Sequence, residues 1–269
     1  MRAGDNILDE IVSRVSSQLQ KKKRDLSWRD LESLSGFELP VRPFRKSLIS
    51  DELSVIAELK KASPVKGVIR ENFNPLELAR AYEEAGASAL SVLTEPDFFQ
   101  GDLENLEKLS SKVSIPLLRK DFIIDPYQVK EAKAYGADAV LIIVTITSGS
   151  QLEELIHAGR ELGIDLLIEC YSQDDLERLD WKQVEILGVN NRNLKSFKVE
   201  LHRGIDLLNQ APDHLVKVSE SGLSTPDDLQ LLSKEGIDAA LIGEFLMQQN
   251  NPGYALQTLL NKARQNESE

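Results

Sequence analysis

The segment VIAELK (residues 55–60) shows the pattern that decides the fold, a short apolar strand that ends in charged side chains. The same pattern returns at residues 117–122 and 188–192. Because side chains alternate between the two faces of a strand, Glu58 and Lys60 point the same way. Charged groups at the end of an apolar interior are costly unless they serve a purpose, so these strand ends are typical of an enzyme.

Strands and helices alternate from residue 55 onward at a nearly constant spacing. Most strand segments are continuous apolar runs, as expected for parallel strands that are covered on both faces. The expected strands are 55–60, 88–95, 115–122, 138–146, 165–170, 184–192, 215–221 and 239–246. Eight strand–helix units in roughly 215 residues predict an α/β fold, a (β/α)8 TIM barrel. An open doubly wound sheet is the alternative, but it usually has fewer strands, and no GxGxxG follows the first strand.

Four expected helices begin with the same sequence pattern. A residue whose side chain can cap free N–H groups is followed by proline in the first turn. It occurs at Asn74, Asp125, Thr225 and Asn251. Glu77 and Gln128 stand three residues after the first two caps and predict capping boxes there.

The chain is expected to be a single domain, with an N-terminal helical extension at 1–54 and the catalytic barrel at 55–269. Apolar residues recur at helical spacing between 7 and 19, which gives one apolar stripe. We expect this helix to plug or flank the barrel. The alternative is a lid over the active face, with Phe44 and its basic neighbours touching the substrate.

Composition excludes several classes of function. A net charge of −12 argues against nucleic acid as a partner, because a phosphate backbone selects for basic surfaces. The longest apolar run, 139–146, is far too short to span a membrane, and the acidic N-terminus does not resemble a signal peptide. A single cysteine, Cys170, suits a reducing compartment. We therefore expect a cytoplasmic protein.

Active sites of (β/α)8 barrels lie at the carboxyl ends of the strands, where this chain carries lysine, glutamate, asparagine and arginine. Histidine is absent from every expected strand end, so acid–base chemistry falls to lysine and glutamate, whose pKa values respond to burial and neighbours. No paired cysteine or histidine ligands are visible, and we expect neither a metal nor a cofactor. The alternative is a Mg²⁺ held by the carboxylates, which the lysines among them would oppose. Gly222 and Gly243 follow the seventh and eighth strands, where backbone N–H groups of such barrels bind phosphate. Glu244 should point away from that anion.

Each candidate also has a plainer explanation. Lys120 beside Asp121 could be a surface ion pair, and the two glycines could simply serve turns. A single glutamate at a strand end is often only the partner of an ion pair. The convergence of lysines, glutamates and an arginine on one barrel mouth favours a catalytic site.

The strand ends resemble the indole-3-glycerol phosphate synthase family of tryptophan biosynthesis. The segments that carry the resemblance are ILDEIV (7–12), IAELKKASP (56–64), LSVLTE (90–95), LRKDFI (118–123), VNNRNL (189–194), SESG (219–222) and LIG (241–243). They occur in order and cover essentially the whole chain. The resemblance implies a lyase that closes an indole ring in 1-(2-carboxyphenylamino)-1-deoxyribulose 5-phosphate, with loss of CO2 and water.

The resemblance also implies roles for individual residues. Lys120 resembles the general acid, Glu169 the base of the dehydration, and Lys60 the partner of the substrate carboxylate, which can share the acid role. The implied catalytic residues are Glu58, Lys60, Lys120, Glu169, Asn190 and Glu220; the implied substrate-binding residues are Ser63, Phe99, Phe122, Arg192, Ser221 and Leu241; the implied phosphate-binding residues are Ser63, Gly222 and Gly243. Which lysine is the principal acid stays open.

Two positions depart from the family pattern. Val65 stands where a second serine is usual, and Tyr171 stands where a histidine is common. A different phosphosugar isomerase or epimerase, and a barrel that has lost activity and serves for assembly, remain alternatives. Neither requires Glu58, Lys60, Lys120 and Glu169 together. The expected partner is a small phosphorylated substrate, without nucleic acid or membrane, and the expected state is a monomer.

Overall fold

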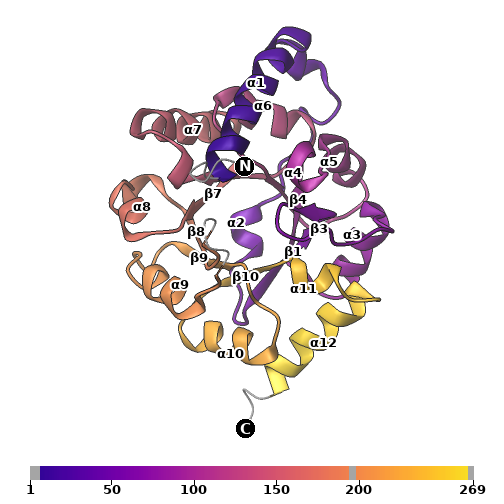
Figure 1. The fold of residues 1–269 in the computed structure, drawn as a ribbon, viewed down its shortest axis with the longest axis vertical. Helices are drawn as coiled ribbons and strands as arrows, with labels where there is room; N and C mark the ends of the chain where they lie inside the picture. The colour runs from indigo at the N-terminus through magenta and orange to yellow at the C-terminus, as the bar shows by residue number, and fades with distance from the viewer. Residues whose placement is uncertain (1–6, 194–197, 266–269) are drawn as a thin grey trace.

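A closed barrel of parallel strands forms the centre of the molecule (Figure 1). The computed structural model describes residues 7–193 and 198–265, so parts of the expected extension (1–6) and barrel (194–197 and 266–269) lie outside the described residues. Within the described residues, eight strands follow the order β1-β10-β9-β8-β7-β6-β5-β4, and β4 pairs back with β1. The strands are β1 (Ser54–Leu59), β4 (Ala89–Leu93), β5 (Leu117–Lys120), β6 (Ala139–Ile143), β7 (Asp165–Cys170), β8 (Ile186–Asn190), β9 (Val216–Glu220) and β10 (Ala239–Ile242). The predicted (β/α)8 barrel is therefore confirmed.

Helices surround the strands as an outer layer (Figure 1). The longer ones are α3 (Pro75–Glu84), α5 (Leu103–Ser110), α6 (Pro126–Ala134), α7 (Gly149–Leu162), α8 (Gln173–Glu177), α9 (Leu201–Leu208), α10 (Pro226–Lys234) and α12 (Pro252–Gln265). The four predicted caps are confirmed, since each side chain accepts a backbone N–H of its helix. The two predicted capping boxes are wrong. Gln128 instead accepts the N–H of Ile124, and a box forms where Thr225 meets Asp228.

Several expected strands end earlier in the structure. The run after β6 forms a 3₁₀ helix, η2 (Val144–Ile146), and the run after β10 begins the short helix α11 (Glu244–Met247). Three further short elements are α4 (Pro96–Phe99) and the 3₁₀ helices η1 (Asp30–Ser33) and η3 (Trp181–Gln183). The loop after β1 contains an unexpected antiparallel pair, β2 (Ala62–Ser63) with β3 (Gly67–Val68).

The amino end of the barrel is closed by the second helix of the extension, α2 (Phe44–Ser47), which Figure 1 shows within the ring of strands. Phe44 is fully buried in the same apolar cluster as the inward-facing side chains of the strands. Its neighbours are anchored at the starts of β6 and β7, where Arg42 pairs with Asp138 and the N–H of Arg45 bonds Asp165. The plug is therefore α2, whereas the expectation of a plug or a flanking helix concerned the apolar stripe at 7–19; the alternative that Phe44 touches the substrate is wrong.

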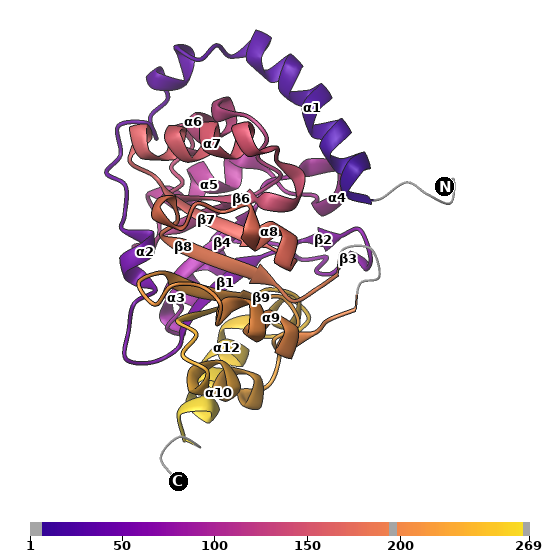
Figure 2. The same ribbon diagram turned by 90° about the vertical axis from the view of Figure 1, so that its left-hand side faces the viewer.

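The first helix, α1 (Ile7–Asp25), runs along the outside of the barrel over α6 (Figure 2). Its buried residues are Leu8, Ile11, Val15 and Leu19. Lys22 and Lys23, in the last turn, form ion pairs with Glu131 and Asp125 of the α6 region at 3.3 and 2.6 Å. None of the helices in the described part of the chain combines the length and apolar character needed to cross a membrane.

Truncating the plug should destabilise the whole barrel. Replacing Phe44 by Ala removes a fully buried ring and leaves a cavity, so the free energy of unfolding should fall by about 3–5 kcal/mol. Chemical denaturation measures this loss. The matched control is Ile49→Ala on the neighbouring exposed position, which should change stability by less than about 0.5 kcal/mol. Equal effects of the two variants would contradict the role of Phe44.

Candidate active site

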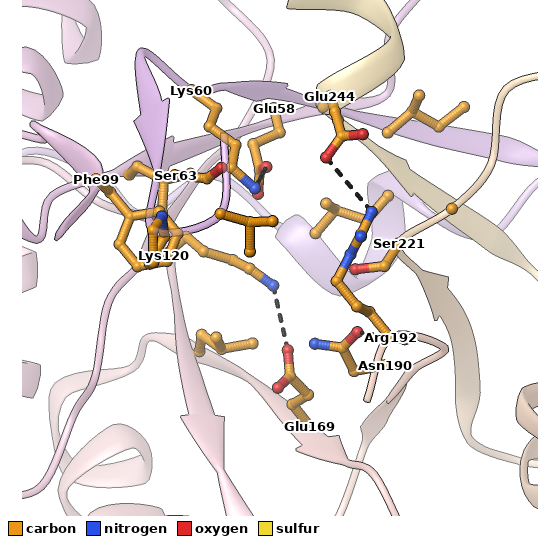
Figure 3. A pocket seen from close by; sticks show the side chains of 18 of the residues that line it. Glu58, Lys60, Ser63, Phe99, Lys120, Glu169, Asn190, Arg192, Ser221 and Glu244 are labelled. Carbon is orange, nitrogen blue, oxygen red and sulfur yellow. Dashed lines mark hydrogen bonds and ion pairs between the residues drawn. The ribbon is translucent and has the colours of Figure 1, made fainter. Parts of the chain in front are cut away.

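A cavity of about 440 Å³ opens at the carboxyl ends of the strands. Figure 3 shows side chains of several strands and loops pointing into it. The sequence-predicted residues that line it are Glu58, Lys60, Ser63, Phe99, Lys120, Phe122, Glu169, Asn190, Arg192, Ser221, Gly222, Leu241 and Gly243. Only Glu220 among the predicted site residues is not part of the lining. The structure thus brings together side chains from segments spread along the whole barrel.

Lys120 is the centre of the charge arrangement. Its ammonium lies 3.2 Å from Glu169 Oε2 on β7 and 2.5 Å from Glu220 Oε2 on β9. Burial lowers the pKa of Lys120, but the carboxylates of Glu220, Glu169 and Glu58 raise it by more, so the net pKa lies above its ordinary value. Lys120 therefore carries its proton at neutral pH.

The residue after Lys120 does not pair with it. Asp121 accepts hydrogen bonds from Arg119 at 3.0 Å and from the Thr94 hydroxyl. Arg119 is fully buried on the outer face of β5, where it also pairs with Glu131 of α6 at 2.9 Å. The plainer explanation of Lys120 and Asp121 as a surface pair is therefore wrong. Strand alternation sends Arg119 outward to fix the strand and Lys120 inward to the cavity.

Glu220 lies below the cavity floor and is fully buried. Burial and the neighbouring Glu169 raise the pKa of Glu220 to about 8, against the opposing effect of Lys120. A Cβ at position 188 on β8 would come within 2.3 Å of Glu220 Oε1, so Gly188 makes room for this carboxylate. Glu220 therefore acts on the cavity through two lining residues, Lys120 and Glu169.

One side of the cavity is aromatic. The rings of Phe99 and Phe122 lie 6.0 Å apart, and the Lys60 ammonium stands 5.6 Å from the centre of the Phe99 ring. Lys60 also lies 3.6 Å from Glu58 Oε1. Phe99 belongs to α4, whose N–H groups at 97–99 are all accepted by the buried carboxylate of Glu95. This wall combines a flat apolar surface with a cation at its edge.

The other side of the cavity offers backbone and cationic groups (Figure 3). Ser221 and Gly222 both adopt left-handed backbone conformations, with φ of 73° and 80°. Gly243 packs so closely on Glu58 that a Cβ would come within 2.4 Å of Glu58 Oε1. Arg192 donates its N–H to Asn190 Oδ1 at 3.0 Å. The predicted phosphate-binding glycines thus lie on the cavity wall, while the Ser63 hydroxyl accepts the N–H of Lys66 in its own turn.

The prediction that Glu244 points away from the anion site is wrong. It lines the cavity and forms ion pairs with Arg192 and Lys66, at 3.4 and 2.7 Å. Burial raises its pKa, but the hydrogen bond from Lys66 and the charges of Arg192 and Lys66 outweigh burial and hold the pKa below its ordinary value.

The first turn of α1 was not predicted to belong to the site. Ile7, Leu8 and Ile11 contribute an apolar part of the cavity wall, so the extension does reach the active face as the lid alternative proposed. Their apolar stripe is indistinguishable in sequence from one that only packs on a barrel.

Tyr171, one of the departures from the family pattern, lies outside the cavity lining. The Arg203 guanidinium stacks 4.1 Å from the centre of its ring, and its hydroxyl accepts a hydrogen bond from Asn193 at 2.6 Å. Arg203 also donates to the carbonyl of Asn190. Tyr171 therefore supports the chain that follows β8.

Among the residues that the structure describes, no cluster of three or more histidine, cysteine or acidic side chains could hold a metal ion. The polar groups of the cavity are instead ammonium, guanidinium, carboxylate, amide and hydroxyl groups. They are suited to holding anions and to moving protons.

The barrel and its polar mouth define the protein as a (β/α)8-barrel enzyme. The family profile described as indole-3-glycerol phosphate synthase matches residues 8–259. The chain is 45% identical to the indole-3-glycerol phosphate synthase of Salinibacter ruber, over 94% of this chain and 95% of that protein. It is also 45% identical to that of Acinetobacter baylyi, over 95% and 96%. The chain belongs to the indole-3-glycerol phosphate synthase family, a family of lyases in tryptophan biosynthesis.

Solved structures support the fold alone. The 3-hexulose-6-phosphate synthase of Salmonella typhimurium superposes with a TM-score of 0.65 at 12% identity, over 79% of this chain and 99% of that one.

Gly222 should tolerate no side chain. Its φ of 80° is strained for other residues, and a Cβ would come within 2.2 Å of Val199. Gly222→Ala should therefore lower the free energy of unfolding by about 1–3 kcal/mol. Thermal and chemical denaturation would measure the loss. Gly149→Ala is the matched control, because a Cβ there meets nothing within 4 Å and the position opens helix α7. A Gly222→Ala protein as stable as the control would contradict the need for glycine.

Proposed function

We propose that this enzyme converts 1-(2-carboxyphenylamino)-1-deoxyribulose 5-phosphate into indole-3-glycerol phosphate, CO2 and water, with Lys120 and Glu169 as its acid and base. One observation carries the proposal. The Lys120 ammonium and the Glu169 carboxylate lie 3.2 Å apart in one cavity. On one side of them is the aromatic wall, and on the other is the anion-binding wall, which consists of Ser221, Gly222 and Gly243. Membership of the family and the names of its relatives support the same reaction.

The chemistry of the substrate matches the two walls. Its benzene ring fits against Phe99 and Phe122, with the ring carboxylate facing the Lys60 ammonium. Its phosphate then extends to the opposite wall, where Ser221, Gly222 and Gly243 offer backbone groups. This orientation leaves the ketone carbon between the walls, near Lys120 and Glu169.

The reaction has three steps. The ring carbon that bears the carboxylate attacks the ketone carbon, and Lys120 protonates the ketone oxygen as it becomes a hydroxyl. The bond between the ring carbon and the carboxylate then breaks and CO2 leaves. The electron pair of that bond stays with the ring and restores its aromaticity. Finally Glu169 accepts a proton from the CH2 group beside the nitrogen, and the hydroxyl takes a proton from the Lys60 ammonium in the same cavity and leaves as water. Arg192 and Asn190 orient the sugar chain, and Glu58 holds Lys60 in place.

Removing the acid should slow the first step. Lys120→Met should lower turnover by about 10²–10⁴-fold, the usual contribution of a general acid, while substrate affinity largely survives. Mixing purified protein with the substrate and following indole fluorescence measures turnover. The control is Lys112→Met on the exposed surface, which should retain normal turnover. Because Lys60 lines the same cavity, Lys60→Met combined with Lys120→Met should be slower than either variant alone.

Glu169→Gln separates the last step from the first two. This variant should release CO2 faster than it forms indole, and both products can be followed in one reaction. Near-normal turnover of Lys120→Met at every pH would contradict the assignment and point to Lys60 as the acid.

Glu220 should determine the pH above which Lys120 loses its proton. Its carboxylate is the strongest influence raising the Lys120 pKa, and burial opposes it. In Glu220→Gln the Lys120 pKa should therefore fall, and Lys120 should lose its proton at lower pH. The alkaline limb of the kcat/KM profile lies above the ordinary lysine pKa of 10.5 in the unmodified enzyme and should move down toward that value in Glu220→Gln, as measured from about pH 6 upward. An alkaline limb that does not move would contradict this coupling.

The proposal includes the setting of the enzyme. The single cysteine, Cys170, is buried and unpaired, which supports a reducing, cytoplasmic location. A monomer is proposed as the working state. We also place the boundary of the extension at residue 54, where β1 begins.

A further inference from the structure

The Glu244 carboxylate lies between two cations at one side of the cavity mouth, Arg192 of the cavity lining and Lys66 just outside that lining. The Lys66 ammonium lies 2.7 Å from Glu244 Oε1, and Arg192 Nη2 lies 3.4 Å from Glu244 Oε2. Figure 3 shows Glu244 beside Arg192 and Ser221, across the cavity from Phe99. One carboxylate thus engages each cation with a separate oxygen.

The backbone places Glu244 at this position. It follows Gly243 directly and begins α11, while Lys66 comes from the β2–β3 turn and Arg192 follows β8. The three side chains therefore link the loops after β1, β8 and β10 across one side of the mouth. Glu244 keeps 29% of its side-chain surface exposed, and Lys66 keeps 41%, so the carboxylate can swing into solvent without crossing a packed core.

An anion site with two uncompensated cations would attract any small phosphate or sulfate. Exposed ion pairs are individually weak, so an incoming dianion can replace an internal carboxylate if it gains further contacts elsewhere. Inorganic phosphate has no other contacts to gain, whereas a phosphorylated ligand with an aromatic end gains the wall of Phe99 and Phe122.

We infer that the Glu244 carboxylate occupies the anion site of the free enzyme and selects against inorganic phosphate and sulfate. A phosphorylated substrate displaces it because the rest of the molecule supplies additional binding. Glu244 then imposes a displacement cost on every anion, so that only a ligand with further contacts in the cavity binds well at low concentration. The inference rests on the proposed function for the place of the phosphate.

Calorimetric titration with inorganic phosphate tests the inference directly. Glu244→Gln removes the charge while keeping the shape, so it should bind inorganic phosphate about tenfold more tightly than the unmodified enzyme. The KM for the phosphorylated substrate should fall by a similar factor, because its phosphate displaces the same carboxylate. Glu52→Gln is the matched control. Glu52 forms an ion pair with Arg264 just before β1, so its removal changes the net charge equally at the other end of the barrel.

A double-mutant cycle with Lys66→Gln tests the mechanism. In the unmodified enzyme Lys66 is neutralised by Glu244, so Lys66→Gln should change phosphate affinity little. In the Glu244→Gln background the ammonium is released, and removing it should reverse a large part of the gain. Glu244→Ser serves as a second variant if Glu244→Gln does not fold, with the same expected direction.

Phosphate affinity that is unchanged or weaker in both Glu244 variants would overturn the inference, as would a gain of equal size in Glu52→Gln. Phosphate binding needs no turnover, so this result is separable from the proposed function. A protein that forms no indole but binds phosphate more tightly as Glu244→Gln would refute the proposed reaction and retain the competing carboxylate.

Discussion

The site depends on one constraint, the closure of parallel strands into a ring with all their carboxyl ends at one mouth. Glu58, Lys120, Glu169 and Glu220 come from four strands that are far apart in sequence, yet their charges interact directly. Burying three carboxylates near one another is unfavourable unless a cation shares the space. Lys120 therefore stabilises the folded mouth and, because of the same carboxylates, keeps its proton at neutral pH.

Local sequence signals were sufficient to predict the fold. Continuous apolar runs marked each of the barrel strands, and Asn74, Asp125, Thr225 and Asn251 capped the helices as expected. Predictions failed where a choice depended on tertiary contacts. Val144-Thr145-Ile146 is apolar enough for a strand, but it turns into a 3₁₀ helix after β6, and Gln128 bonds Ile124 rather than its cap.

The site could be predicted only in part, for a similar physical reason. Strand alternation identified the inward-facing pairs, since Glu58 with Lys60 and Asn190 with Arg192 all line the cavity. The sequence did not indicate how deeply each of these side chains is buried. Glu220 follows the same strand-end pattern, but it lies beneath the floor because Gly188 leaves space for it. The ion-pair partners of long charged side chains could not be predicted from the sequence either. Glu244 is an example, because Lys66 and Arg192 belong to loops that meet it only in the folded chain.

The N-terminal extension contacts both ends of the barrel. Its α2 closes the amino end with Phe44, and the first turn of α1 forms part of the cavity wall at the other end (Figure 2). Between these points Arg14 and Gln18 bind Asp97 at 3.3 and 2.9 Å, and Asp97 belongs to α4, the helix that carries Phe99. Because Phe99 faces the Lys60 ammonium, a shift of α1 would be transmitted to the aromatic side of the cavity. The extension is therefore part of the framework that positions the aromatic side of the cavity, although its described residues in the cavity lining are all apolar.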